Sequence, residues 1–189
     1  VWKPKQINTF ETEWGFSCMG YEISGALGIK MAKPDQDVIV FIGDGSYLLA
    51  NSDIYSSVIY DKKLIIVVCD NGGHMVINRL QLAKGGKEYI CNLRAARATN
   101  LQFVDFEMHA KSMGANGETV TSTSELEAAF LRAKKSDKTY VISLKTDGYE
   151  WLEGTSFWES PTSEIHTTEE NKKAYADFVE GKKKQRKGI

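Results

Sequence analysis

Two short apolar runs separated by a helix-length segment dominate the hydrophobic pattern of the chain. The runs are residues 38–42 and 64–68, and each ends at glycine or at small and polar residues. Continuous apolar runs of this length, rich in valine and isoleucine, predict strands that are buried on both faces. The intervening residues 46–60 predict a crossover helix. Two buried strands joined in this way lie parallel and side by side, so both end at the same edge of a sheet.

The rest of the chain continues the alternation of helices and strands. This alternation predicts an α/β fold, with a doubly wound, mostly parallel sheet and helices on both faces. After Gly148 the pattern stops, and a C-terminal tail with a helix follows. We therefore expect a domain over residues 1–148 and a C-terminal extension over residues 149–189. The further predicted elements are helices over residues 20–31, 75–82, 105–112, 124–135 and 169–184, and strands around Val120 and over residues 139–144.

Composition excludes several classes of protein. Apolar residues make up 42% of the chain and charged residues 26%, with a net charge of −1, which argues against a broad nucleic-acid surface. No apolar run approaches the roughly 20 residues that cross a bilayer, and no secretory pattern is visible at the start. The three cysteines have no paired spacing and predict neither a disulfide framework nor a zinc site. We expect a cytoplasmic protein without membrane or nucleic-acid partners.

Polar residues follow both apolar runs directly. Gly43-Asp44-Gly45-Ser46 follows the first run, and Asn71 lies just after the second. Open α/β sheets bind ligands at this edge, and carboxylate and amide oxygens suit Mg²⁺ that also binds phosphate. Glycines permit close backbone approach, and amides at a helix start can donate to phosphate. From the residues alone, an ordinary turn in which Asp44 caps the next helix remains an alternative.

This combination of motif, crossover and asparagine resembles the thiamine-diphosphate-dependent enzymes, in their diphosphate-binding domain. The resemblance implies that thiamine diphosphate and Mg²⁺ are the cofactors. It further implies three metal ligands and a set of residues at the diphosphate. The metal ligands are Asp44, the side chain of Asn71 and the main-chain oxygen of Gly73, and the diphosphate residues are Gly43, Gly45 and Ser46.

A second segment, residues 15–20, resembles the element of this family that supports the bent cofactor. Met19 matches the apolar residue beneath the cofactor rings, and the carbonyl of Ser17 matches the acceptor of the pyrimidine amino group. Composition alone favours an ordinary core methionine at Met19, and the resemblance reverses that preference. The loop after Asn71 departs from the family pattern, so His74 faces either the substrate or solvent. His74 and Met75 are kept as candidate cofactor contacts.

Shorter segments along most of the chain are similar to one branch of the family. That branch hydrolyses a carbon–carbon bond and opens the ring of trihydroxycyclohexane-1,2-dione in myo-inositol breakdown. The resemblance therefore implies a thiamine-diphosphate-dependent hydrolase with a small diketone substrate. The segments are residues 13–22, 77–81, 104–106, 109–110, 113–115, 157–159 and 185–186, together with Pro161.

The resemblance also implies parts that this sequence does not contain. In the family, the glutamate that activates the cofactor belongs to a pyrimidine-binding domain, usually of a neighbouring subunit. We therefore expect part of a longer, homo-oligomeric enzyme whose catalytic residues are not in this chain, and the isolated chain should be inactive. One alternative is a separate subunit of a 2-oxo acid decarboxylase or acetolactate synthase-like enzyme. Another is a non-enzymatic α/β binding module.

Overall fold

The computed structural model describes residues 3–12, 16–151 and 161–185. Residues 13–15, 157–159 and 186, which carry part of the resemblance, lie outside the described residues. Contacts divide the chain into two compact units. Unit 1 comprises Val1–Asp70 and Phe103–Thr146, and unit 2 comprises Asn71–Gln102 and Asp147–Ile189.

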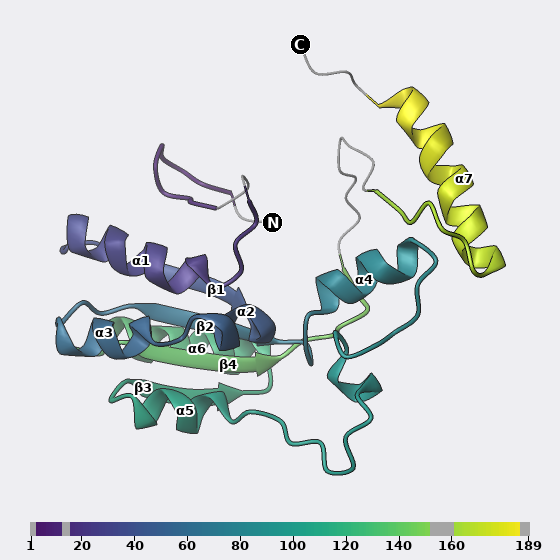
Figure 1. The fold of residues 1–189 in the computed structure, drawn as a ribbon. Helices are drawn as coiled ribbons and strands as arrows, with labels where there is room; N and C mark the ends of the chain where they lie inside the picture. Colours follow the sequence, from purple (N-terminus) through teal and green to yellow (C-terminus); the bar gives the residue numbers. More distant parts are fainter. Residues whose placement is uncertain (1–2, 13–15, 152–160, 186–189) are drawn as a thin grey trace. The chain divides into compact units, whose positions relative to one another are not determined.

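In the described part of unit 1, a parallel sheet is the central layer (Figure 1). Its strands follow the order β1-β2-β4-β3, and all three neighbouring pairs are parallel. The two apolar runs form β1 and β2, which pair directly as expected. The predicted α/β class and the parallel sheet are confirmed. The strands are β1 (Ile39–Gly43), β2 (Ile65–Asp70), β3 (Asn116–Val120) and β4 (Tyr140–Lys145).

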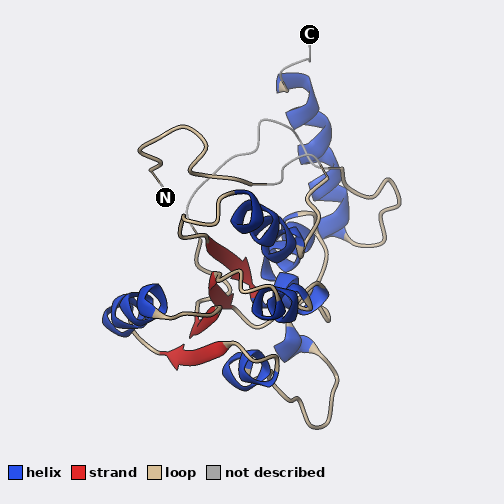
Figure 2. Ribbon diagram, turned by 90° about the vertical axis from the view of Figure 1, so that its left-hand side faces the viewer, coloured by secondary structure: helices blue, strands red, loops and turns tan. Residues whose placement is uncertain are grey.

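Helices cover both faces of this sheet (Figure 2) because successive strand side chains point to opposite sides. Ile66 and Val68 of β2 belong to one core cluster, whereas Ile65 belongs to the other. The first cluster includes Tyr47 of α2 (Asp44–Leu49) and residues of three further helices, and the second packs against one helix. The helices are α1 (Tyr21–Ala32), α3 (Asp53–Ile59) and α5 (Phe106–Ser112) on the first face and α6 (Thr123–Lys135) on the second.

The crossover between β1 and β2 differs from the single helix expected over residues 46–60. It forms two short helices, α2 (Asp44–Leu49) and α3. At Ala50 the backbone leaves the helical region, with φ −149° and ψ 69°. An ideal Cβ placed on Gly20 would lie 2.7 Å from the Cβ of Ala50. The break therefore packs closely against Gly20, the residue directly before α1. The local hydrophobic pattern does not show this tertiary contact.

Unit 2 contains α4 (Met75–Ala83), the 3₁₀ turn η1 (Leu93–Ala95) and α7 (Glu169–Lys184). The start of α7 contacts the turn that follows α4. Asn171 Nδ2 donates to the carbonyl of Gly85 at 2.7 Å. Gly85 has φ +77°, and an ideal Cβ there would lie 2.7 Å from the carbonyl oxygen of Glu170. The predicted C-terminal helix is therefore docked on unit 2. None of the helices in the described ranges has the length and apolar character needed to cross a membrane.

Candidate functional site

The carboxyl edge of the sheet brings two buried carboxylates into unit 1. β1 and β2 are in register with Gly43 beside Cys69, so Asp44 and Asp70 are the next residues of their chains. Asp44 is 2% exposed and Asp70 is 5% exposed. Burial raises the pKa of the Cys69 thiol, and the Asp44 charge raises it further. Asp44 and Cys69 are therefore neighbours at this edge of the sheet, as the predicted parallel arrangement requires.

Asp70, the residue directly before Asn71, is fixed at the end of its strand. Its carboxylate forms an ion pair with Lys145 of β4, and its carbonyl accepts from Thr146 N at 2.9 Å. The Lys145 ammonium also lies 5.2 Å from the centre of the Phe103 ring, within cation–π range. Sequence reasoning missed Lys145, although a lysine that ends an apolar strand at this edge is an available signal.

The motif after β1 continues into a buried anchor. Gly45 is buried and Ser46 is half-buried in the first turn of α2, whose first amides have no acceptor within the helix. Tyr47 is fully buried, and its hydroxyl lies 2.9 Å from Nδ1 of His109 on α5. Burial raises the pKa of Tyr47 far above its ordinary value. The Tyr47 contact therefore ties α2 and its first-turn amides to α5.

The segment before α1 is exposed where the sequence predicts a cofactor contact. Met19 is 45% exposed, so it is not part of the hydrophobic core. Ser17 has φ +51°, a left-handed conformation that is uncommon for residues other than glycine. Such conformations cost energy and cluster at functional sites. Both positions are accessible in unit 1, as a contact with a ligand would require.

In unit 2, the loop that follows Asn71 is held by a short antiparallel bridge. Gly73 pairs with Asn92, His74 N donates to the carbonyl of Cys91 at 2.8 Å, and Leu93 N donates to Gly72 at 3.0 Å. Gly73 has φ +136°, and an ideal Cβ there would lie closer than 3.0 Å to the Cys91 carbonyl oxygen. Glycine is therefore required where a main-chain metal ligand is predicted.

The next two predicted contacts lie at the start of α4. His74 is half-buried and occupies the position before the helix, with φ −89° and ψ 63°. Met75 is 3% exposed, and an ideal Cβ on Gly148 would lie 2.9 Å from its Cε. Met75 therefore packs against Gly148, the residue just before the C-terminal extension.

A polar cluster in unit 2 was not predicted from the sequence. We call it the Glu88 cluster, and it consists of Glu88, Asn78, Asn92 and Tyr149. Oε1 of Glu88 accepts from Asn78 Nδ2 at 2.9 Å, Tyr149 OH at 2.8 Å and Asn92 Nδ2 at 3.2 Å. These hydrogen bonds, with that from Asn78 the largest, lower the pKa of Glu88. No motif marks these residues, and Asn78 and Tyr149 lie 10 and 61 residues from Glu88 in the sequence.

The predicted metal-ligand set is divided between the units. Asp44 belongs to unit 1, whereas Asn71 and Gly73 belong to unit 2. Among the described residues, no group of three or more His, Cys, Asp or Glu side chains could hold a metal ion. One carboxylate, one amide oxygen and one main-chain oxygen form a different donor set, which suits Mg²⁺ that takes its other oxygens from phosphate.

Comparison with known proteins identifies relatives over most of the chain. The chain is 38% identical over 181 residues to 3D-(3,5/4)-trihydroxycyclohexane-1,2-dione hydrolase of Halalkalibacterium halodurans, a match that covers 93% of this chain. The Bacillus subtilis protein of the same name is 37% identical over 181 residues, again 93% of this chain, and that of Lacticaseibacillus casei is 36% identical over 187 residues, or 96%. The chain spans 28% of the length of each of these relatives.

A solved structure and a family model agree with these relatives. The structure is a thiamine diphosphate-dependent 4-hydroxybenzoylformate decarboxylase of Rhodococcus jostii, with TM-score 0.57 and 25% identity, covering 68% of this chain and 23% of that one. The family model described as "Thiamine pyrophosphate enzyme, C-terminal TPP binding domain" matches residues 1–144. The chain therefore belongs to the thiamine pyrophosphate enzyme family, as a C-terminal TPP binding domain.

Proposed function

We propose that the chain is the cofactor-binding part of a hydrolase that opens the ring of trihydroxycyclohexane-1,2-dione. The observation that carries the proposal is the buried Asp44, which begins α2 at the carboxyl edge of the sheet, beside the end of β2. The names of relatives that are 36–38% identical supply the reaction class. They favour a hydrolase over the decarboxylase, whose identity to this chain is 25%.

In this proposal, Mg²⁺ is bound by Asp44, the side chain of Asn71 and the main-chain oxygen of Gly73. The close fit around Gly73 supports its part, because no side chain is tolerated there. Gly43, Gly45 and Ser46 contact the diphosphate, Ser17 and Met19 contact the rings, and His74 and Met75 remain candidate contacts. When bound, thiamine diphosphate supplies an electron sink for breaking the bond between two adjacent carbonyl carbons. The residues of this chain bind and orient it.

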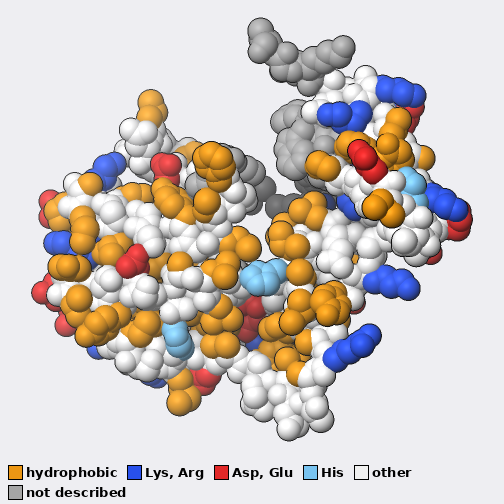
Figure 3. All heavy atoms as spheres, in the orientation of Figure 1, with side chains coloured by type: hydrophobic (Ala, Val, Ile, Leu, Met, Phe, Trp, Pro, Cys, Tyr) orange, Lys and Arg blue, Asp and Glu red, His pale blue; other side chains and the backbone are white. Residues whose placement is uncertain are grey.

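The proposal includes a partner domain. The activating glutamate would come from a pyrimidine-binding domain of the same enzyme or of a neighbouring subunit in a homo-oligomer. Exposed apolar side chains at Phe16 (90%), Met19 (45%) and Leu49 (57%) of unit 1 support contact with further protein. Hydrophobic side chains also reach the surface in Figure 3, interspersed with polar and charged groups.

Two further expectations belong to the proposal. We place the cofactor-binding domain in residues 1–148 and the extension in residues 149–189, which is supported by the family match to residues 1–144. A cytoplasmic location is supported by the free thiols of Cys69 and Cys91, since reducing compartments keep thiols unpaired.

Calorimetry with thiamine diphosphate, in the presence and absence of Mg²⁺, tests the proposal. Binding should require Mg²⁺, and Asp44→Ala should weaken it at least about tenfold because a charged ligand is lost. Asp35→Ala is the matched control, because Asp35 is an exposed aspartate before β1. Equal binding by Asp44→Ala and Asp35→Ala, or binding independent of Mg²⁺, would contradict the proposal. The isolated chain should not turn over the dione.

A further inference from the structure

The Glu88 cluster joins three segments of unit 2 through one carboxylate oxygen. Asn78 comes from α4, Asn92 from the loop before η1, and Tyr149 from the segment after β4. Tyr149 OH also accepts from Asn92 Nδ2 at 2.7 Å, so two of the three donors are linked to each other as well as to Glu88. Hydrogen bonds to an ionised carboxylate are stronger than those between neutral groups. The carboxylate is therefore the common acceptor that holds these segments together.

Asn92 connects the cluster to the loop that carries Gly73. Asn92 is 2% exposed and pairs with Gly73 in the antiparallel bridge. Both polar atoms of its side chain form hydrogen bonds: Nδ2 donates to Glu88, and Oδ1 accepts from Arg94 N at 3.1 Å. The bridge hydrogen bonds on either side of this pair are made by the neighbours of Asn92 and Gly73. The position of Asn92 therefore sets the position of the Gly73 backbone.

Asn78 connects the cluster to the other end of the same loop. Its main-chain N donates to the carbonyl of His74 at 3.0 Å, in the first turn of α4. The side chain is 1% exposed, and its Oδ1 has no hydrogen-bond donor among the described residues. Its amide nitrogen donates to Glu88. Because a buried amide is costly to leave unpaired, the side chain of Asn78 depends on the Glu88 carboxylate for its orientation.

We propose that Glu88 is a positioning residue for the metal site, which fixes the main-chain oxygen of Gly73 through Asn92 and Asn78. The inference rests on the proposed function, in which that oxygen binds Mg²⁺. Glu88 itself does not contact the metal or the substrate in this scheme. Magnesium demands near-ideal octahedral geometry, so a small displacement of one ligand weakens its binding.

Hydrogen exchange tests the structural half of the inference without any cofactor. Glu88→Ala should speed exchange of the His74 and Leu93 amides, which form the bridge, by about tenfold. Glu88→Gln should remain within about threefold of the wild type, because its amide oxygen can still accept. Glu150→Ala is the charge-matched control, as Glu150 is exposed and lies beside Tyr149. Equal exchange in Glu88→Ala and Glu150→Ala would overturn the inference.

Magnesium titration tests the functional half. At fixed thiamine diphosphate, Glu88→Ala should raise the Mg²⁺ concentration for half-maximal binding about tenfold, with rescue by Glu88→Gln. If Glu88 had a merely structural role, Glu88→Ala would lower thermal stability but leave the Mg²⁺ concentration for half-maximal binding unchanged. That outcome would overturn the positioning role. If Glu88→Ala does not fold, Tyr149→Phe, at a position 49% exposed, removes one donor and should show smaller shifts of the same sign. Wild-type chain that binds without Mg²⁺ would refute the proposed function, while exchange still decides whether Glu88 holds the loop.

Discussion

Replacing Gly73 by alanine tests how tightly the predicted metal loop is built. The added Cβ would lie closer than 3.0 Å to the carbonyl oxygen of Cys91 and 3.3 Å from the amide nitrogen of Leu93. Both atoms are backbone, and both residues make bridge hydrogen bonds. The loop cannot relieve the overlap by turning a side chain, so the bridge itself must open.

The magnitude follows from the contacts that would be lost. Two bridge hydrogen bonds, from His74 N and Leu93 N, contribute about 1 kcal/mol each. Holding alanine at φ +136° in the closed loop costs ~1–3 kcal/mol, because that conformation is essentially restricted to glycine. We therefore expect Gly73→Ala to lower the free energy of opening the loop by roughly 1–3 kcal/mol, which is enough to offset the two bridge hydrogen bonds. Magnesium-dependent binding of thiamine diphosphate should be lost with it.

Gly28→Ala is the control for the loss of a glycine. Gly28 lies within α1, is exposed, and has no atom within 4 Å of an ideal Cβ. Alanine is the better helix residue, so this variant should be stabilised by about 0.5–1 kcal/mol. Hydrogen exchange at His74 and Leu93 measures the loop, and thermal unfolding measures the whole chain. Unchanged exchange at both amides in Gly73→Ala would refute the reasoning.

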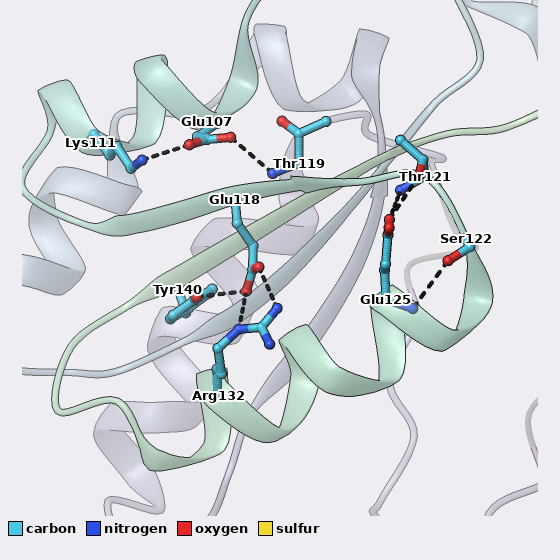
Figure 4. Close-up of polar contacts among 9 residues, drawn as sticks. All are labelled: Glu107, Lys111, Glu118, Thr119, Thr121, Ser122, Glu125, Arg132 and Tyr140. Carbon is cyan, nitrogen blue, oxygen red and sulfur yellow. Dashed lines mark hydrogen bonds and ion pairs between the residues drawn. The ribbon is translucent and has the colours of Figure 1, made fainter.

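Two further variants test anchors of unit 1. Tyr47→Phe removes the hydroxyl that bonds His109, so the free energy of unfolding should fall by about 0.5–1.5 kcal/mol, and an unchanged urea midpoint would contradict this. Figure 4 shows Glu118 facing Arg132 and Tyr140. The hydrogen bond from Arg132 is the largest of the contributions that hold the pKa of Glu118 below its ordinary value of 4.5. That stabilisation is complete above pH 4.5 and is lost as pH falls through the lowered pKa. Glu118→Gln should therefore lower the melting temperature at pH 7 but not in strong acid, whereas a difference independent of pH would count against the ion pair.

The strands and most helices were predictable because their signals are local. The run at residues 64–68 is apolar throughout, and β2 is buried on both faces. Asp105 was expected to cap a helix, and its side chain accepts from Met108 N at 2.9 Å at the start of α5. The break at Ala50 packs against Gly20, thirty residues earlier in the sequence, a contact that no local pattern shows.

The same distinction separates the parts of the candidate site. Asp44 could be placed at the edge from topology alone, since parallel strands joined by one crossover end together. The hydrogen-bond partners of Glu88 could not be predicted, because Asn78 and Tyr149 lie 10 and 61 residues away in the sequence and match no helix or strand periodicity. Side-chain hydrogen bonds between irregular segments become visible only in three dimensions.

Three of the anchors nevertheless share a pattern, because each fixes the backbone near a predicted ligand. Tyr47 is held three residues after Asp44, and the Asp70 ion pair lies directly before Asn71. The Glu88 cluster holds the strand that pairs with Gly73. A preorganised site needs its ligands within about 0.5 Å of the productive geometry, which backbone anchoring provides before the ligand arrives. Loss of an anchor should therefore weaken cofactor binding by a larger factor than loss of an equally buried contact elsewhere in the sheet.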